Sequence, residues 1–244
     1  NDGVTCQTYV NGKLEGSGTV TGTLATDSNI IYVGSSLDGS PTNYLKGTID
    51  EIRVSDIART ADEIRYNGLR HPYSVYTSKV LNLTNATSWS QFTWMAKGVR
   101  NTDGETPVST SGLVASWNLN ETSGTTAVSS GSCGASCNGT LTNFASTASQ
   151  DQSHGTGWTA ANKRWGAGAL MFDDSNDVVT ATIPDVSSTY TLSAWVNMSV
   201  SNPAYFVSLS NKIRMSQANN NQFDCAMNNG ANWESLSSGI SLPT

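Results

Sequence analysis

Short runs of β-branched and aromatic residues, each bounded by Gly, Asn, Asp or Ser, recur along this chain of 244 residues. Such runs are typical of β-strands joined by turns. The first, Thr5–Val10, ends at Asn11-Gly12, a pair that favours a hairpin because both central turn positions need a positive φ. Further runs cover 29–33, 47–54, 113–119, 178–183 and 190–197. The sequence therefore predicts an all-β chain folded as a sandwich or jelly roll.

One segment, from Thr60 to Tyr66, has a helical pattern instead. Thr60 can cap the first turn, Glu63 stands three residues later as in a capping box, and Gly68 follows the end. We expect one or two helical turns here and strands elsewhere.

Composition excludes two classes of partner. The net charge is -6, and the 13 Lys and Arg residues are scattered, so no basic surface is expected to hold nucleic acid. No apolar run approaches the roughly 18 residues that span a bilayer, and the first residues have no signal-peptide pattern. Only 13% of residues are charged, so Ser, Thr and Asn carry the surface polarity, which favours an extracellular or cell-surface protein.

Four segments resemble one known family. Residues 45–66 contain Gly-Thr-Ile-Asp-Glu-Ile-Arg followed by Ala-Arg and an acidic helix, a pattern similar to the closing strand of concanavalin A-like, laminin G-like jelly rolls. Residues 113–121 resemble the opening strand of that family. The Phe-Asp-Asp segment at 169–179 and the Leu-Ser-Ala-Trp-Val run at 190–196 resemble later strands. The resemblance implies a jelly-roll β-sandwich.

The order of these segments is permuted relative to the family. We interpret residues 1–68 as the C-terminal half of one jelly roll, 69–112 as a spacer, and 113–244 as the N-terminal part of a second jelly roll. About one strand, roughly ten residues, is missing at the join. The chain is either a fragment cut from a longer protein or a repeat that a neighbour completes.

Neither half alone can cover two facing sheets, so each must find its complement. Family order favours separate units. We therefore predict that the closing half packs on the opening half of a neighbouring copy, head to tail, in an arrangement that extends into a filament.

The spacer itself matches the jelly-roll pattern poorly. Ser74–Leu83 and Ser88–Met95 alternate well enough to predict two strands, and Trp89, Phe92 and Trp94 argue against a plain flexible tether. Gly104 and the residues that follow have the composition of a linker.

The four cysteines predict an oxidising environment. Cys133 and Cys137 close a short Gly-rich loop without nearby zinc ligands, so a local disulfide is expected, with free thiols as the alternative. Cys6 and Cys225 both lie on predicted strands that could meet in a completed jelly roll. A bond between them would join the two halves and could run between chains.

The resemblance also implies a structural calcium ion, because many relatives carry one near the closing strand. The candidate ligands are Asp50 and the turn that contains Asp173, Asp174 and Asp177. A tight acidic turn offers the carboxylate and carbonyl oxygens that Ca²⁺ requires. The alternative is that Asp50 pairs with Arg53 and that the turn is simply polar.

The sequence contains little evidence of a catalytic site, so we expect that this chain is not an enzyme. The jelly-roll glucanases need two carboxylates in a Glu-x-Asp-x-Glu strand, and that spacing does not occur here. His71 and His154 lie in loop-like stretches without a nucleophile motif, where a solvated histidine is the simpler interpretation.

Two functions remain. The first is a structural or adhesive repeat of an extracellular fibre or cell-surface protein, with neighbouring copies of itself as partners. The second is a carbohydrate-binding module with glycans as partners, for which fold analogy alone is a weak argument. Trp158 and Trp165 flank a polar segment and could stack on sugars, whereas Trp117, Trp195 and Trp233 lie in strand patterns that favour the core.

Five Asn-x-Ser/Thr sequons occur, about as many as chance predicts for this composition, so their number is not evidence of glycosylation. If any is modified, we expect Asn82, Asn85 or Asn138, which lie in the spacer or in turns. Asn197 follows a core-like strand and is expected to be bare.

Overall fold

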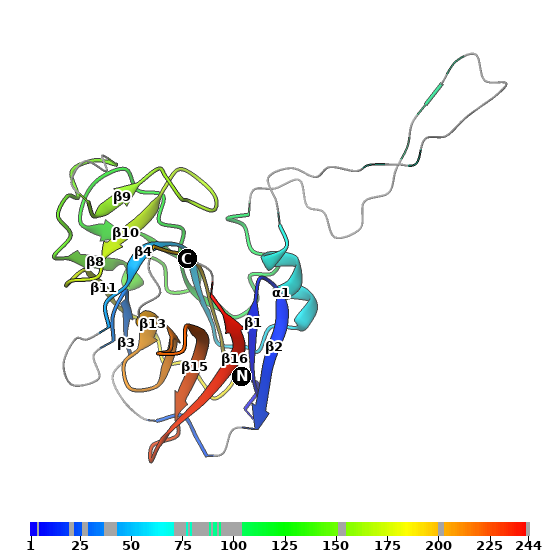
Figure 1. Ribbon diagram of the computed structural model, residues 1–244, viewed down its shortest axis with the longest axis vertical. Helices are drawn as coiled ribbons and strands as arrows, with labels where there is room; N and C mark the ends of the chain where they lie inside the picture. Colours follow the sequence, from blue (N-terminus) through cyan, green and yellow to red (C-terminus); the bar gives the residue numbers. More distant parts are fainter. Residues whose placement is uncertain are drawn as a thin grey trace.

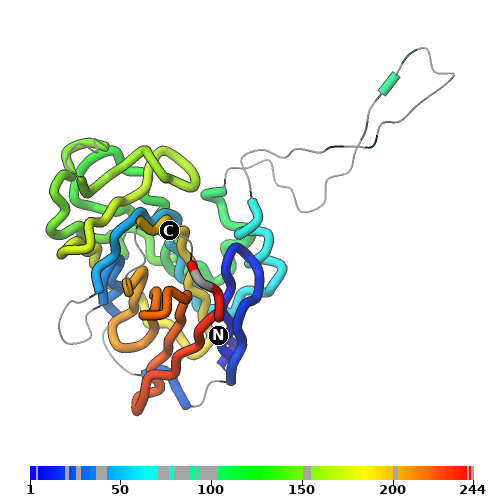
Figure 2. The backbone as a smooth tube through the Cα atoms, viewed as in Figure 1, coloured from blue at the N-terminus to red at the C-terminus, as the bar shows by residue number. Residues whose placement is uncertain are grey.

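The strands assemble into one eight-stranded and one six-stranded sheet, which we describe from a computed structural model (Figures 1 and 2). All strand pairs within these sheets are antiparallel. The structure describes residues 1–3, 5–19, 22–25, 29–36, 43–70, 104–150, 155–199 and 203–242, together with positions 77, 79, 88, 90, 91 and 93.

The eight-stranded sheet carries the C-terminal strands at one end. From that end its order is β16 (Trp233–Ser241), β15 (Gln222–Asn228), β14 (Ile213–Gln217), β13 (Ala204–Leu209), β3 (Ile30–Val33), β11 (Val178–Thr182), β8 (Gly139–Thr142) and β6 (Thr126–Ala127). Its inward face is apolar, because alternate residues such as Val33, Val207 and Met215 lie in register across β3, β13 and β14.

The six-stranded sheet is built around its longest strand, β4 (Lys46–Ser55). One edge of β4 pairs with β12 (Thr191–Met198) over nearly its whole length. Its other edge pairs first with β10 (Ala169–Asp173) and then with β5 (Leu113–Trp117). The outer strands of that side are β9 (Gly157–Thr159) and β7 (Ser129–Ser130).

Three smaller elements complete the described fold. A separate hairpin is formed by β1 (Thr5–Val10) and β2 (Lys13–Thr19) and turns at Asn11-Gly12, as the sequence predicts. The helix α1 (Ala61–Gly68) begins with the predicted capping box, in which Thr60 and Glu63 exchange side-chain and backbone hydrogen bonds. The 3₁₀ turn η1 (Gly134–Cys137) contains the Cys133–Cys137 disulfide, which confirms that prediction.

The two halves of the chain share both sheets. The early strand β4 lies between β12 and the pair β5 and β10, and β3 lies between β11 and β13. The expectation that residues 1–68 and 113–244 belong to separate units joined head to tail is therefore wrong. The physical reason is burial: the apolar face of each half finds its complement in the same chain, and the segment between them is long enough to let the chain fold back.

The core lies between the two sheets and draws on both halves. Ile31, Ile49 and Ile52 from the first half pack with residues such as Leu170 and Phe172 from the second, each at most 2% exposed. An all-β jelly-roll type of fold is thus confirmed. Among the described residues, no helix is both long and apolar enough to cross a membrane. Most of the predicted spacer strands at 74–83 and 88–95, together with His71 and His154, lies outside the described residues.

Candidate functional site

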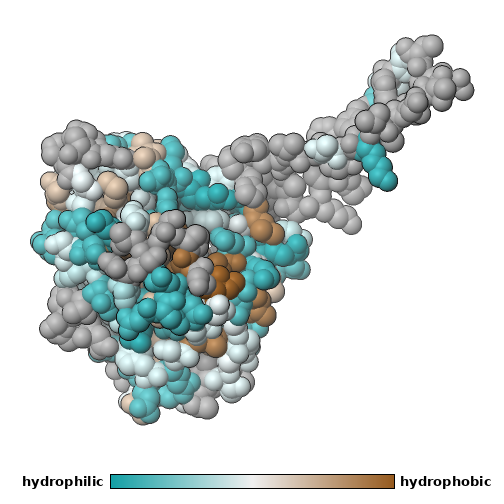
Figure 3. Space-filling view, viewed as in Figure 1, coloured by the Kyte–Doolittle hydropathy of each residue, from teal (hydrophilic) through white to brown (hydrophobic). Residues whose placement is uncertain are grey.

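A cavity of about 360 Å³ opens between β12, the β1–β2 hairpin and α1. We call it the edge groove, because it follows the side of β12 that faces away from β4. In Figure 3 hydrophobic residues gather near the middle of the visible face, among hydrophilic surroundings.

The edge groove has two chemically different walls. The wall toward the core is apolar, and the wall on the outer side of the six-stranded sheet is polar. The apolar wall contains Val196, Met198, Phe206, Met215, Phe223 and Leu242. The polar wall contains Glu51, Arg53, Ser55, Arg59, Ser193 and Asn197. A ligand here would therefore meet an apolar surface on one side and hydrogen-bonding groups on the other.

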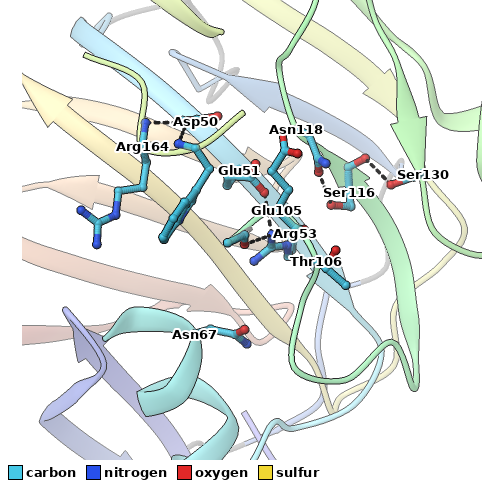
Figure 4. Close-up of polar contacts among 12 residues, drawn as sticks. Asp50, Glu51, Arg53, Asn67, Glu105, Thr106, Ser116, Asn118, Ser130 and Arg164 are labelled. Carbon is cyan, nitrogen blue, oxygen red and sulfur yellow. Dashed lines mark hydrogen bonds and ion pairs between the residues drawn. The ribbon is translucent and has the colours of Figure 1, made fainter. Parts of the chain in front are cut away.

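The polar wall is anchored by a buried ion pair. The Nη2 atom of Arg53 lies 2.6 Å from Oε2 of Glu51 and also donates to the carbonyl oxygens of Gly104 and Glu105, at 3.1 Å and 2.6 Å. Figure 4 shows these side chains beside one another. Burial lowers the pKa of Arg53, and the nearby charges of Glu51 and Asp50 oppose that effect. Because both side chains are at most 9% exposed, the pair is shielded from salt.

Glu51 has an unusual backbone, with φ at +53°. It lies in a bulge, where the pairing of β4 with β12 shifts between Ser193 and Trp195. It also marks the point where the other edge of β4 changes partner from β10 to β5. The bulge turns the Glu51 side chain toward Arg53, and positive φ in a non-glycine residue costs of order 1 kcal/mol or more. The hydrogen-bonded strand pairs on both sides of the bulge must offset that cost.

Asp50 has a different role from the one that the calcium hypothesis requires. Its Oδ2 atom accepts hydrogen bonds from the backbone N–H groups of Arg164 and Trp165, at 2.7 Å and 3.1 Å. It neither reaches the acidic turn nor pairs with Arg53 in the contacts observed. Burial raises the pKa of Asp50 to about 6, even though these hydrogen bonds act in the opposite direction.

The acidic turn lies farther along the sheet. Asp173 pairs in register with Lys46, four residues from Asp50 on β4, which corresponds to about 13 Å of strand. Within the turn, Oδ2 of Asp177 accepts from the N–H of Asp173 at 3.1 Å, and burial raises the pKa of Asp177 to about 7. The residues described contain no group of three side chains placed to hold a metal ion, Asp174 included. The donor set expected for a shared Ca²⁺ ion is therefore not assembled.

The two tryptophans proposed for sugar stacking are core residues instead. Trp158 is 1% exposed and donates to the carbonyl oxygen of Gly124 at 2.7 Å, and Trp165 is 7% exposed. The prediction was wrong because β9 and the 164–165 turn fold inward against β10 and Asp50. Conversely, Trp195 is only partly buried, borders the edge groove and packs under the Arg164 guanidinium at 4.3 Å.

A second aromatic cluster lies on β13, β14 and β16. The Arg214 guanidinium is 4.4 Å from the ring centre of Trp233 and 5.6 Å from that of Tyr205. All three side chains are partly exposed. Two flat rings that flank a cation form a polar and aromatic patch, which sequence patterns alone did not predict because the three residues lie on three different strands.

Cys6 and Cys225 lie close together in this single chain. Their thiols form a hydrogen bond that lowers the pKa of Cys6, whereas the same hydrogen bond and burial raise the pKa of Cys225. The contact joins β1 to β15 and so connects the hairpin to the eight-stranded sheet. Both cysteines are free thiols here, so the bond between them stays a prediction.

The sequons are placed differently from the expectation. Asn138 is partly buried, and its Oδ1 atom accepts from the N–H of Ser129 at 2.9 Å. Asn197, expected to be bare, is exposed and borders the edge groove. Asn82 and Asn85 lie outside the described residues.

Comparison with known proteins gives one match. Residues 1–65 match a laminin G-type family model, described as the concanavalin A-like lectin/glucanases superfamily. No curated protein and no solved structure matches the chain. The match covers the hairpin, β3, β4 and most of α1, and thus includes the part of the edge groove that carries Glu51 and Arg53.

Proposed function

Because residues 1–65 match a family model of the concanavalin A-like lectin/glucanases superfamily, we propose that this chain is a binding module of the adhesive kind in an extracellular protein. It binds its partner at the edge groove and has no catalytic role. Its partner is a protein.

The edge groove is the observation that carries this proposal. It combines an apolar wall with a polar wall, and Trp195 and Tyr9 contribute aromatic surface at its border. Partly buried aromatic residues that border polar groups are frequent in protein interfaces. The carboxylate that lines it, Glu51, is paired with Arg53, and the neighbouring Asp50 accepts from two backbone N–H groups, which supports binding rather than acid-base chemistry.

The extracellular setting rests on the disulfide and on the surface. Cys133–Cys137 is the kind of bond that persists in oxidising compartments. The proposed function includes no calcium ion, because Asp50 and the acidic turn that contains Asp173 are separated along the sheet.

Solid-phase binding tests this function. The purified chain is immobilised and exposed to a panel of purified matrix proteins and, separately, to a glycan array. We expect saturable binding of at least one protein, lost in Ser193→Trp, which fills the edge groove, and kept in Ser235→Trp, which changes an exposed strand serine outside it. Failure to bind any protein, or equal loss in both variants, would contradict the proposal.

A carbohydrate-binding role is the second candidate, and the cluster of Tyr205, Arg214 and Trp233 is the observation that favours it. Hits on the glycan array that disappear in Arg214→Gln would support it. Arg164→Gln is the matched control, because Arg164 also stacks on a tryptophan but at the edge groove. Loss in both variants, or no hits, would remove this candidate.

A further inference from the structure

We infer that Lys212 and Asn29 join their side chains in an intramolecular amide bond, with Asp185 as the group that carries the proton. This modification site lies apart from the edge groove and does not rest on the proposed function. The bond ties the two halves of the chain together covalently, because the two residues stand 183 positions apart in the sequence.

The first argument is the direct contact of the three side chains. Nζ of Lys212 donates to Oδ1 of Asn29 at 2.6 Å and to Oδ1 of Asp185 at 2.7 Å. Because a C=O bond is about 1.23 Å long, the amide carbon Cγ of Asn29 lies no more than about 3.8 Å from Nζ. Reacting atoms that are held ~3–3.5 Å apart are in position for attack. The amine, the amide and a carboxylate are therefore assembled around one nitrogen.

The second argument is that main-chain hydrogen bonds fix all three residues at one end of the eight-stranded sheet. Asn29 directly precedes β3, and its carbonyl oxygen accepts from the N–H of Ile183 at 2.9 Å, two residues before Asp185. On the other side of β3, the N–H of Ser210 donates to the carbonyl oxygen of the first residue of β3 at 2.8 Å, two residues before Lys212. The strands that flank β3, β11 and β13, thus deliver the carboxylate and the amine to the amide. Groups held in this way react without the entropy cost of meeting.

The third argument is the burial of the amine. Lysine usually keeps its ammonium group in water while its carbon chain packs on the protein. The side chain of Lys212 is only 4% exposed, whereas that of its partner Asp185 is 73% exposed. An ordinary surface ion pair leaves both charged groups in water and contributes little to stability. Burial of Lys212 keeps away the water that would compete for Cγ, and the exposed side of Asp185 gives ammonia a way out.

The reaction needs no oxidant, cofactor or second protein. Asp185 takes one proton from the ammonium group of Lys212, and Nζ forms a bond to Cγ of Asn29 while an electron pair of the C=O bond moves to Oδ1. Asp185 then passes its proton to Nδ2 of Asn29 and takes a second proton from Nζ. The electron pair on Oδ1 re-forms the C=O bond, the Cγ–Nδ2 bond breaks, and ammonia leaves. The ammonia takes the remaining proton from Asp185 and departs as ammonium, which restores the carboxylate.

The test is the mass of the purified full chain after reduction of its disulfide. We expect a mass lower than the sequence value by one ammonia, about 17 Da. Trypsin should then release one branched species that joins residues 14–46 to 165–214, because trypsin does not cut after an acylated lysine. The peptide map is decisive, since succinimide formation at an Asn-Gly pair also releases ammonia but joins no peptides.

Four variants separate the roles. Lys212→Arg keeps a cation but has no nucleophile, and Asn29→Ala has no amide, so both should show the full sequence mass and no branched species. Asp185→Asn changes an exposed side chain and should leave the fold intact, yet the fraction converted at a fixed time after synthesis should fall about tenfold or more. Lys13→Arg is the matched control, because Lys13 also pairs with a carboxylate, Glu15 at 2.9 Å, but is 76% exposed. It should convert as the parent does.

A parent chain with its full sequence mass and no branched species would overturn the inference. Loss of ammonia that persists in Lys212→Arg would overturn it too, because the reaction would then lie elsewhere in the chain. Equal conversion of the parent and Asp185→Asn would contradict the proton transfer assigned to Asp185. All of these outcomes are independent of whether the edge groove binds a protein, so the proposed function and this inference fail separately.

Discussion

At the scale of single residues, the buried pair of Glu51 and Arg53 is the most consequential contact beside the edge groove. Arg53 also holds the carbonyl oxygens of Gly104 and Glu105, so its side chain connects β4 to the segment before β5. A buried charge that loses its partner cannot recover the solvation it gave up on folding.

Arg53→Met should therefore lower the free energy of unfolding by roughly 3–5 kcal/mol, because it leaves the Glu51 carboxylate buried without its partner. Denaturation in urea would measure the change. The double variant Glu51→Gln with Arg53→Met should recover part of the loss. If the single variant is as stable as the parent, the pair does not hold this part of the sheet.

Asp50 predicts a dependence of stability on pH. Its pKa in the folded chain is about 6, above the roughly 3.9 of an unfolded aspartate, so the folded chain holds this proton more tightly. Its contribution to stability is fully present below about pH 4 and is lost as pH rises through about 6. The difference in unfolding free energy between the parent and Asp50→Asn should change across this window. If the difference in unfolding free energy does not change with pH, the pKa of Asp50 is not raised in the folded chain.

At the scale of elements, the sequence predicted those strands whose residues alternate or are continuously apolar. The predicted runs at 5–10, 29–33, 47–54, 113–119, 178–183 and 190–197 all became strands, with ends displaced by one or two residues at most. The strands β13 and β14 were not predicted, and β15 and β16 were indicated only by the strand patterns around Cys225 and Trp233, without bounds. Buried polar residues such as Ser208, Gln217 and Asp224 interrupt their apolar pattern, and only cross-strand partners explain their burial.

The candidate site was harder to predict than the strands. Asp50 and Arg53 were recognised within a family pattern, but Trp195 was assigned to the core, since its strand alternates like a buried one. Assigning Trp195 to the core assumes that its strand, β12, has a neighbouring strand along both edges. Which edge of a strand lacks a partner depends on sheet order, and no local pattern of residues encodes it.

The contact between Cys6 and Cys225 gives a prediction for the β1–β2 hairpin. Incubation of the folded chain with oxidised glutathione should form this bond through a mixed disulfide: each thiol loses a proton, and two molecules of reduced glutathione leave. Peptide mapping under non-reducing conditions would detect the cross-linked pair. The chain with Cys6→Ser should give only the Cys133–Cys137 linkage. Mixed disulfides that never resolve would show that the two thiols do not meet.

At the scale of the whole molecule, the shared sheets make the two halves one folding unit. A protease site inserted at residue 90 would allow the chain to be cut between the halves without touching either sheet. In a Lys212→Arg chain, which cannot form the proposed amide bond, we expect both fragments to elute together at the size of the intact chain and to separate only in denaturant, because β4 and β3 are paired on both edges by strands of the other fragment. Spontaneous separation in buffer would restore the model of independent halves.

The position of β4 between strands that are made later also affects how the chain folds during synthesis. β4 leaves the ribosome before its partners β5, β10 and β12 have been made. In the same way, β3 is made before its partners β11 and β13. At ~5–20 residues per second, the roughly 150 residues between β4 and the end of β13 require on the order of ten seconds. Until β12 has been made, β4, the longest of the described strands, lacks its partner along one edge. Newly made chains would then depend on chaperones more than a protein of this size with local pairing, and crowding of ribosomes on one message would favour aggregation between nascent chains.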